Sequence, residues 1–333
     1  MQTKASEFND KTILITGGAG FIWSNLAIFL QAEAPDSVII IFDKFRTDDS
    51  GKDLICHSLG HYQNLTEFYG HVICGDITKQ CDLELLNQYK FDFIFHQAAI
   101  SDTRMYDQEL LLRTNVNSFE YFLGKAKNDN ATLVYASSAA TYGSLPAPQN
   151  EGVTCPENVY GYSKRVMDDM AFKFCQLNPA VRIVGLRYFN VYGPREQFKG
   201  RSSSMILQLA QQILEGKNPK LFIGSDSIFR DFVHINDVVS ANLLASHCVH
   251  NGVYNVGTGK SRSFTDIVDI LQGELGTKLP VDYIPNPYKG YQYDTRACTK
   301  TAYKFLQYKS ALSLEEGIAD FIPYILKMHK TDW

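Results

Sequence analysis

The sequence lacks the features of a membrane protein and of a disulfide or zinc scaffold. No apolar run reaches the roughly 18 residues that a membrane-spanning helix needs, and the first ten residues hold no apolar signal core. The cysteines are odd in number, scattered and without a Cys-x-x-Cys pair: Cys56, Cys74, Cys81, Cys155, Cys175, Cys248 and Cys298. This pattern is typical of free thiols in a reducing compartment. We therefore expect a cytoplasmic protein with no membrane insertion and no metal site.

The chain has no large excess of basic or of acidic residues. The chain has 32 Lys and Arg against 36 Asp and Glu, a formal net charge of −4, which argues against a nucleic-acid partner. No internal repeat or low-complexity segment is present. With 333 residues, 45% of them hydrophobic, the chain can bury a large core in two domains or lobes.

The most informative feature that is present is a glycine-rich turn, Thr16-Gly-Gly-Ala-Gly-Phe-Ile-Trp23, between an apolar run and a helix-like stretch. A strand, such a turn and a helix in this order are typical of a dinucleotide site. Gly17 permits the tight turn, and Gly20 lets the backbone approach a pyrophosphate at the helix N-terminus. The third glycine of the Gly-x-x-Gly-x-x-Gly spacing is replaced by Trp23, at a position where helix and strand pack closely.

Strand-length apolar runs alternate with helical stretches in the first half. We expect strands at 11–16, 37–43, 71–75, 91–97, 131–137 and 182–189, and helices at 21–32, 81–89, 105–128 and 160–178. This alternation predicts an α/β protein with a Rossmann-like, doubly wound parallel sheet. In the second half we expect helices at 203–215, 235–248, 264–275 and 313–327, with strands at 220–224 and 252–257.

The change in character between the halves predicts two units. We expect residues 1–189 to form a dinucleotide-binding domain, with residues 234–262 returning to it. Residues 190–233 and 263–333 are expected to form a smaller, mixed α/β substrate-binding lobe.

Charged residues follow the second expected strand. Asp43 ends this strand, 23 residues after Gly20, and can accept hydrogen bonds from adenosine ribose hydroxyls. Lys44 and Arg46 can hold a 2′-phosphate, which favours NADP, whereas a solvated loop with NAD as the cofactor is the alternative. We expect further cofactor contacts at the turn and at the ends of later strands, from Phe21, Ile22, Asp76, Ile77, Gln97, Ala98, Ala99 and Asn115.

A serine and a Tyr-x-x-x-Lys pair follow the fifth expected strand. Ser138 ends the strand, and Tyr160 and Lys164 share one helix face. The lysine ammonium is expected to lower the pKa of the phenol from ~10, making Tyr160 an acid/base near neutrality, and both residues can also contact the cofactor. Tyr121 and Lys125 have the same spacing, but no serine-ended strand precedes them, so we interpret that pair as structural.

In this order the motifs resemble the extended short-chain dehydrogenase/reductases that act on nucleotide sugars. The resemblance covers nearly the whole chain and rests on six segments: Tyr135-Ala-Ser-Ser-Ala-Ala-Thr-Tyr-Gly143, Asn158-Val-Tyr-Gly-Tyr-Ser-Lys164, Arg187-Tyr-Phe-Asn-Val-Tyr-Gly-Pro-Arg-Glu196, Lys199-Gly200, Arg230-Asp-Phe-Val233 and Tyr254-Asn-Val-Gly-Thr-Gly259. Within this superfamily the chain is most similar to the ADP-L-glycero-D-manno-heptose 6-epimerases, mainly through Lys199 after Pro-Arg-Glu.

The resemblance implies a carbon-6 epimerisation of an ADP-linked manno-heptose, by transient oxidation to a ketone and re-reduction with bound NADP. The carbonyl oxygen then occupies two places, and Tyr160 and Lys199 are the candidate acid/base residues. By spacing alone, Lys199 also fits a surface or phosphate-contacting lysine. The resemblance further implies a homo-oligomer, a role in bacterial lipopolysaccharide synthesis, and substrate contacts from Ser138, Asn190, Lys199, Phe222, Arg230 and Tyr291.

The two residues after Ser138 bear on which related activity the chain has. A 4,6-dehydratase needs an added carboxylic acid and base there, and this chain has Ala139 and Ala140. Another nucleotide-sugar epimerase or reductase stays open, because Ser138, Tyr160 and Lys164 would serve it equally.

Trp23 leaves the state of the cofactor site open. An indole brings roughly 200 Å² of surface, and overpacking a tight site costs ~1–3 kcal/mol. It can tilt the helix, crowd the pyrophosphate or turn outward. The outcome is a working enzyme, a cofactor-impaired variant, or a non-enzymatic binding or assembly module that keeps the fold.

Overall fold

The computed structural model describes residues 5–46, 59–287 and 292–330. At its centre lies a seven-stranded sheet in which every neighbouring pair of strands is parallel. The strand order is β10-β6-β5-β4-β1-β2-β3. The strands are β1 (Thr12–Thr16), β2 (Val38–Asp43), β3 (His71–Cys74), β4 (Phe93–His96), β5 (Thr132–Ser138), β6 (Arg182–Tyr188) and β10 (Gly252–Val256).

Helices cover both faces of this sheet, which is why its inner strands are apolar on both sides. Ile13 and Ile15 of β1 belong to one core with α1 (Phe21–Glu33), α7 (Ile235–Ser246) and α9 (Lys300–Leu306). Leu14 points the other way, into a core with α2 (Gln80–Glu84), α4 (Phe119–Asp129) and α5 (Val159–Leu177). The predicted doubly wound α/β fold is confirmed.

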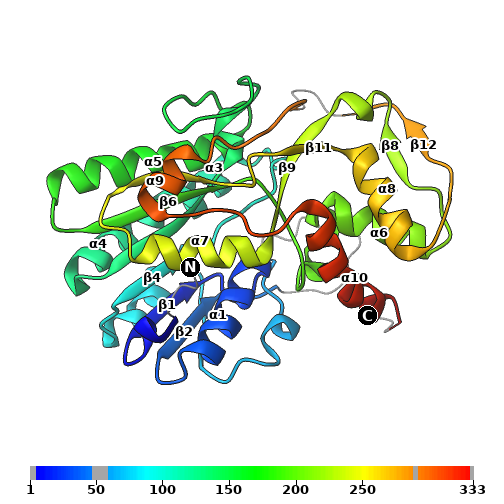
Figure 1. Cartoon of the computed structure of the whole chain (residues 1–333). Coiled ribbons are helices and arrows are strands. Elements are labelled where there is room, and N and C mark those ends of the chain that lie inside the picture. Colours follow the sequence, from blue (N-terminus) through cyan, green and yellow to red (C-terminus); the bar gives the residue numbers. More distant parts are fainter. Residues whose placement is uncertain (1–4, 47–58, 288–291, 331–333) are drawn as a thin grey trace.

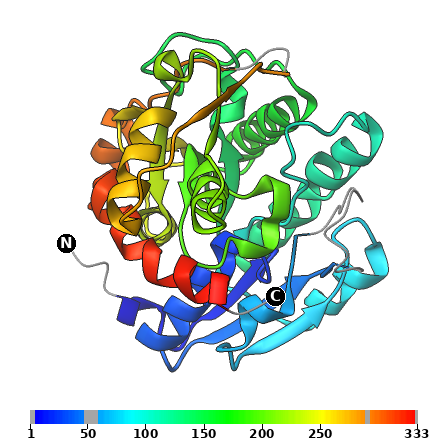
Figure 2. The same cartoon turned by 90° about the vertical axis from the view of Figure 1, so that its right-hand side faces the viewer.

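The second half also contributes a smaller group of elements with its own core. Three helices share this core: α6 (Met205–Leu214), α8 (Phe264–Leu275) and α10 (Leu314–Lys330). Beside them lie two small sheets, β11-β9-β7 and β12-β8, built from β7 (Asn190–Tyr192), β8 (Lys220–Phe222), β9 (Phe229–His234), β11 (Ser261–Ser263) and β12 (Asp282–Ile284). Figure 1 shows α6, α8, β8 and β12 grouped at one end of the molecule, and Figure 2 looks onto that end.

The strand order places a ligand crevice between β1 and β4. From β1 the chain builds outward to β2 and β3, whereas β4, β5 and β6 extend the sheet on the opposite side. The connection after β1 therefore runs toward one edge of the sheet, and the connection after β4 runs toward the other edge. In open parallel sheets, ligands bind at such a switch, beyond the carboxyl ends of the strands.

Some elements differ from the sequence expectation. The helix expected at 105–128 is divided into α3 (Gln108–Leu112), a wide π-helical turn (Arg113–Asn117) and α4. Asp107 caps the first piece, because its Oδ1 accepts from Leu110 N at 2.9 Å. In the π-helical turn, Asn115 is buried and its side chain bonds both backbone polar atoms of Ile100. Strands β7, β11 and β12 have three residues each, too few to show a periodic pattern.

Trp23 is fully buried on the sheet side of α1. Its ring centroid lies 5.4 Å from that of Phe95 on β4, within the core shared by α1 and α7. The indole therefore does not turn outward. Its Nε1 is buried with no hydrogen-bond partner in the described part of the chain. An unpaired buried donor costs about 1–3 kcal/mol, so this core accepts the ring at an energetic cost.

No helix within the described ranges is long and apolar enough to cross a membrane. The six cysteines that the structure describes are free thiols.

Candidate active site

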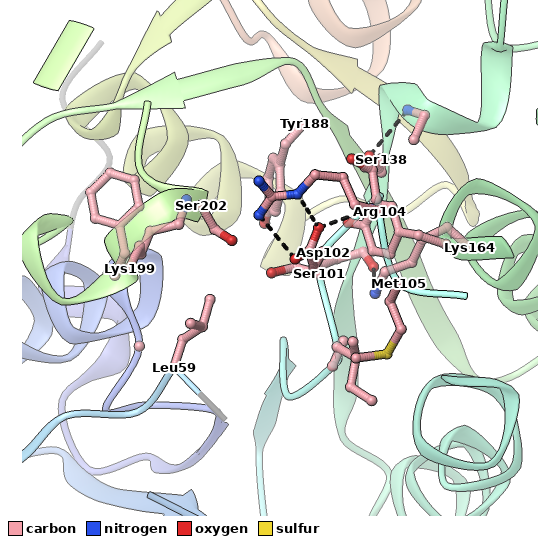
Figure 3. Close-up of a pocket in the computed structure, with 18 of the residues that line it drawn as sticks. Leu59, Ser101, Asp102, Arg104, Met105, Ser138, Lys164, Tyr188, Lys199 and Ser202 are labelled. Carbon is pink, nitrogen blue, oxygen red and sulfur yellow. Dashed lines mark hydrogen bonds and ion pairs between the residues drawn. The ribbon is translucent and has the colours of Figure 1, made fainter. Parts of the chain in front are cut away.

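A large cavity opens at the carboxyl ends of β1, β4 and β5, between the sheet and the smaller group of elements. Its volume is about 1520 Å³. A typical pocket for one drug-sized ligand has about 300–1,000 Å³, so this cavity has room for a dinucleotide together with a second molecule. Figure 3 shows Lys199 and Ser202 on one side of it and Ser138 and Lys164 on the other.

The glycine-rich turn forms one wall of the cavity. Gly17 adopts a φ of +70°, and a Cβ there would lie 2.9 Å from Ala98 N. Only glycine fits this position, for steric and conformational reasons. Gly20 caps the 13-residue helix α1 without a side chain. The first amides of the helix are therefore accessible to an anion such as a pyrophosphate.

Asp43 supports this turn from the end of β2. It is buried, and its oxygens accept from Ala19 N at 2.9 Å and from Phe45 N at 2.8 Å. Burial raises the pKa of Asp43, although these backbone bonds oppose the increase. Each carboxylate oxygen keeps a second lone pair, so Asp43 can still accept from a ribose hydroxyl.

The two basic residues after Asp43 differ in position. Lys44 lines the cavity, and its Nζ lies 2.8 Å from Asp76 Oδ2. Burial acts to raise the pKa of Asp76, but its interactions with Lys44 and Thr78 lower it below the usual range. Arg46 does not line the cavity. Its guanidinium donates to the carbonyl of Phe198, one residue before Lys199.

The segment after β4 forms the floor of the cofactor side. Ala98 N donates to Thr16 Oγ1 at 3.2 Å, which fixes this backbone against the glycine turn. Gln97 and Ala99 line the cavity with it, as do Phe21, Ile22 and Ile77 from neighbouring elements. Gln97 Oε1 is buried and has no hydrogen-bond partner among the described residues. These features fit a dinucleotide.

Asn115 lies behind this floor instead of lining it. Its amide bonds the backbone of Ile100 at 2.8 and 3.0 Å and donates to Ser163 Oγ at 3.0 Å. In this geometry Asn115 ties the floor to α5 and has no exposed atom for the cofactor. The expectation of a direct contact from its side chain is not met.

The structure brings Ser138, Tyr160 and Lys164 together. Ser138 ends β5, and Tyr160 lies in the first turn of α5. Lys164 is buried, and its Nζ donates to Ala136 O at 2.8 Å and lies 5.9 Å from the centroid of the Tyr160 ring. The side chain of Asn158 caps α5 by accepting from Gly161 N at 2.8 Å, which fixes the first turn.

The pKa expected for Tyr160 is wrong for the polypeptide. Burial raises the pKa of the phenol, and its interaction with Ser138 opposes the rise only in part. The Lys164 ammonium is itself desolvated, which lowers its pKa to about 8 although Asp168 acts in the opposite direction. Lys164 is buried and donates to Ala136 O, and it does not lower the pKa of Tyr160 as expected.

Lys199 lies on a 3-10 turn, Gln197–Ser202, and is half-buried. Its Nζ lies 5.3 Å from the centroid of the Phe21 ring, at the first residue of α1. Burial lowers the pKa of Lys199, and the neighbouring carboxylate of Glu196 opposes this effect. The next side chain back, Phe198, stacks on His61 with ring centroids 3.8 Å apart.

Three of the expected substrate residues lie on strands of the two small sheets beside the cavity. Asn190, Phe222 and Arg230 line it from β7, β8 and β9. Arg230 is buried, donates to Phe229 O at 2.9 Å and to Gln292 O, and lies over the ring of Phe264. Tyr291 lies outside the described residues.

One pair of cavity residues was missed by the sequence reasoning. After β4, Asp102 and Arg104 form two parallel contacts, from Nε to Oδ1 at 2.9 Å and from Nη2 to Oδ2 at 3.0 Å. Figure 3 shows them between Ser138 and Lys199 in this view. Asp-Thr-Arg has no distinctive spacing, so only the fold reveals that this loop faces the cavity.

Comparison with known proteins places the chain in a family. The model of the NAD dependent epimerase/dehydratase family matches residues 13–257. The Helicobacter pylori ADP-L-glycero-D-manno-heptose-6-epimerase is similar at 43% identity with a TM-score of 0.89, over 98% of this chain and 99% of that one.

Two further solved structures are similar at 25% identity. The Thermotoga maritima UDP-glucose 4-epimerase with UDP-glucose has a TM-score of 0.83, over 96% of this chain and 99% of that one. The Bacillus cereus UDP-glucuronic acid 4-epimerase, with UDP-glucuronic acid and NAD, has a TM-score of 0.81, over 95% and 99%. The family model covers well over half of the chain, which thus belongs to the NAD-dependent epimerase/dehydratase family.

Proposed function

We propose that this enzyme inverts carbon 6 of an ADP-linked manno-heptose, using NADP that stays bound and is recycled. The observation that carries the proposal is the presence of two titratable groups, Tyr160 and Lys199, on separate elements of one cavity. Inversion of a carbinol centre needs a proton acceptor and a proton donor at two oxygen positions. The 43% identity to the Helicobacter pylori heptose epimerase supports this substrate.

The cofactor side of the cavity suits a dinucleotide. Gly17, Gly20 and the first amides of α1 would hold the pyrophosphate, Asp43 the adenosine ribose, and Lys44 a 2′-phosphate. Arg46 does not line the cavity, so its guanidinium would have to leave the Phe198 carbonyl to bind a 2′-phosphate. When bound, the nicotinamide accepts a hydride from the sugar and returns it.

The pKa of Tyr160 is raised and that of Lys199 is lowered, which suits one group to donate a proton and the other to accept one. The raised pKa of Tyr160 keeps the phenol protonated at neutral pH, which suits proton donation to a carbonyl oxygen. The lowered pKa of Lys199 increases the neutral amine that can accept a proton from a hydroxyl. In the reverse reaction the two residues exchange these roles. Ser138 would hold the reacting oxygen, and Lys164 would orient Tyr160 and bond a ribose.

The substrate side suits a nucleotide diphosphate. The Arg230 guanidinium is fixed by backbone carbonyls and can meet a phosphate in two-point contact. Phe222 can stack on a base, and Asn190, which is exposed at the start of β7, can bond sugar hydroxyls. We further propose that residues 1–189 with 234–262 form one domain and that residues 190–233 with 263–333 form the other, apart from α9, which packs in the core of the main sheet. We also propose that the enzyme is a cytoplasmic homo-oligomer whose product is used in lipopolysaccharide synthesis.

Other reactions of the family are less suited to this cavity. Ala139 and Ala140, the first residues of the turn after Ser138, supply no carboxyl group for a 4,6-dehydration. A 4-epimerase would use the same Ser138, Tyr160 and Lys164, but it does not require Lys199.

The test is turnover of ADP-D-glycero-D-manno-heptose by the purified enzyme, followed by separation of the two epimers, with UDP-glucose and UDP-glucuronic acid as competing substrates. We expect turnover of the heptose only. Lys199→Met should abolish epimerisation, whereas Lys217→Met, at an exposed lysine paired with Glu215, should not. Preferred turnover of a UDP-hexose, or full activity of Lys199→Met, would reject the proposal.

A further inference from the structure

A buried glutamate, Glu196, directly precedes the turn that carries Lys199. The side chain of Glu196 has no exposed surface, and its carboxylate accepts three hydrogen bonds. Ser204 donates two of them, from N at 2.8 Å and from Oγ at 2.7 Å, and Gly193 N donates the third at 3.4 Å. A buried carboxylate is costly unless it is bonded in this way. The fold therefore keeps an acid at this position with dedicated donors.

These bonds close the turn at both ends. The backbone carbonyl of Glu196 accepts from Lys199 N at 3.0 Å, while its carboxylate holds Ser204, two residues after the turn. Ser204 also caps α6, because its Oγ accepts from Leu207 N at 3.2 Å. One residue thus connects the backbone of Lys199 to the start of a packed helix.

The backbone of the turn is irregular, so its shape depends on such contacts. Gly200 adopts a φ of +52° and interrupts the helical geometry immediately after Lys199. A Cβ on Gly200 would meet no atom within 4 Å, so no other group packs against that side of Gly200. Closure by Glu196 therefore fixes the direction in which Lys199 leaves the backbone.

We propose that Glu196 is a positioning residue, whose buried carboxylate closes the turn 197–202 and holds Lys199 over Phe21, facing the substrate. This inference rests on the proposed function of Lys199. The charge of Glu196 has a second effect, because it favours the protonated form of the lysine and so opposes the effect of burial on its pKa.

Other titratable groups surround the turn, but burial and Glu196 are the two influences on the pKa of Lys199. His61 stacks on Phe198, and Arg46 donates to the Phe198 carbonyl. Arg201 lies near the end of the turn and also lines the cavity. Tyr192 and His234 pack edge-to-face behind Gly193. Removal of the Glu196 charge should therefore lower the pKa of Lys199 further.

Three variants separate position from charge. Glu196→Gln keeps the shape and removes the charge, Glu196→Asp keeps the charge and shortens the reach, and Ser204→Ala removes one donor but keeps the acid. The lysines are ¹³C-methylated, and Lys199 is assigned by its absence in Lys199→Met. The pKa of Lys199 is then read by NMR titration, without turnover, alongside kcat and KM for the ADP-heptose.

We expect Glu196→Gln to lower the pKa of Lys199 and to reduce kcat about tenfold or more, with KM nearly unchanged. Glu196→Asp should lose kcat but keep the pKa, and Ser204→Ala should resemble the parent in pKa with a smaller loss of kcat. An unchanged pKa and kcat in Glu196→Gln would overturn the inference. Absence of heptose turnover by the parent enzyme would instead reject the proposed function, and the NMR titration would still decide the role of Glu196. If Glu196→Gln does not fold, an unchanged kcat in Glu196→Asp would overturn the inference.

Discussion

Lys44 forms an ion pair with Asp76, with Nζ and Oδ2 2.8 Å apart, at the edge of the cavity where β2 and β3 end. Lys44 keeps half of its side chain exposed, whereas Asp76 is nearly buried. The carboxylate thus holds the ammonium at the edge of the cavity, where we propose that it binds the 2′-phosphate of NADP.

Lys44→Ala should therefore weaken NADP binding and leave NAD binding nearly unchanged. A charge-assisted bond to phosphate is worth about 1.5–3 kcal/mol, which corresponds to a loss of roughly 10- to 150-fold in affinity. Titration calorimetry with both dinucleotides gives the ratio. Lys79→Ala, at an exposed lysine three residues after Asp76, is the matched control. Equal weakening of NAD and NADP would show that Lys44 acts by positioning Asp76 and not by binding phosphate.

Tyr160→Phe should reduce turnover about 10²- to 10⁴-fold while the fold and the bound cofactor persist, because only a proton donor is lost. Turnover and the dinucleotide content of the same sample measure the two effects. The chain supplies its own control in Tyr121, whose hydroxyl bonds Leu83 O at 2.9 Å and Asn87 Oδ1 at 3.1 Å, away from Ser138. Tyr121→Phe should cost about 1 kcal/mol of stability and no activity. Retained turnover in Tyr160→Phe would remove this residue from the mechanism.

The fold was predictable because its signals are local. Alternating apolar runs fix the strands and helices, and the glycine turn fixes where β1 meets α1. The relation between Tyr160 and Lys164 follows from helix geometry alone, since four residues return to the same face. Sequence reasoning therefore places the residues of one element correctly with respect to each other.

What depends on several elements was not predictable. Asp102 and Arg104 face the cavity only because β4 ends beside β1. Glu196 meets Ser204 because a turn doubles back, and the pKa of Tyr160 depends on burial that no spacing reveals. Arg46 follows Asp43 closely in sequence, yet its guanidinium points to Phe198. In each case the deciding contact comes from residues distant in the chain or from tertiary packing.

Lys164 should reduce the stability of the enzyme at neutral pH. Its pKa falls from the ordinary 10.5 to about 8 on burial, so the folded state binds fewer protons than the unfolded state between these values. Stability therefore rises with pH across this window, and below about pH 8 the full penalty of about 3 kcal/mol applies. Lys164→Met removes the penalty but also the bond to Ala136 O, worth about 1 kcal/mol.

We expect Lys164→Met to be about 2 kcal/mol more stable than the parent at pH 7, with the gain lost as the pH approaches 10.5, and to be inactive. Urea denaturation at several pH values measures the difference. Lys125→Met is the contrasting variant, because Lys125 is ion-paired with Asp129 at 2.9 Å and donates to Tyr89 O at 2.7 Å. Its loss should destabilise the fold at pH 7, since it leaves a buried charge unpaired. A destabilised Lys164→Met at pH 7 would contradict the assigned penalty.

Trp23 decides whether the glycine turn still serves a cofactor. Its indole fills the core beside Phe95, so Trp23→Gly should leave a cavity and cost about 3–5 kcal/mol in unfolding free energy. Trp23→Phe keeps an aromatic contact and removes the unpaired Nε1 donor, so its stability should lie within about 1 kcal/mol of the parent. Thermal unfolding of the three proteins gives these differences.

Mass spectrometry of the small molecules released on denaturation then tests the site itself. We expect stoichiometric NADP from the parent, because the indole lies on the sheet side of α1 and leaves the amides of the first turn accessible. If Trp23→Gly is more stable than the parent and alone retains dinucleotide, the tryptophan overpacks the turn and the natural chain is a cofactor-impaired variant. If neither protein binds or turns over a nucleotide sugar, the fold serves as a non-enzymatic module. NADP in the parent together with a destabilised Trp23→Gly would show that the core has adapted to the indole and that the third glycine of the motif is dispensable here.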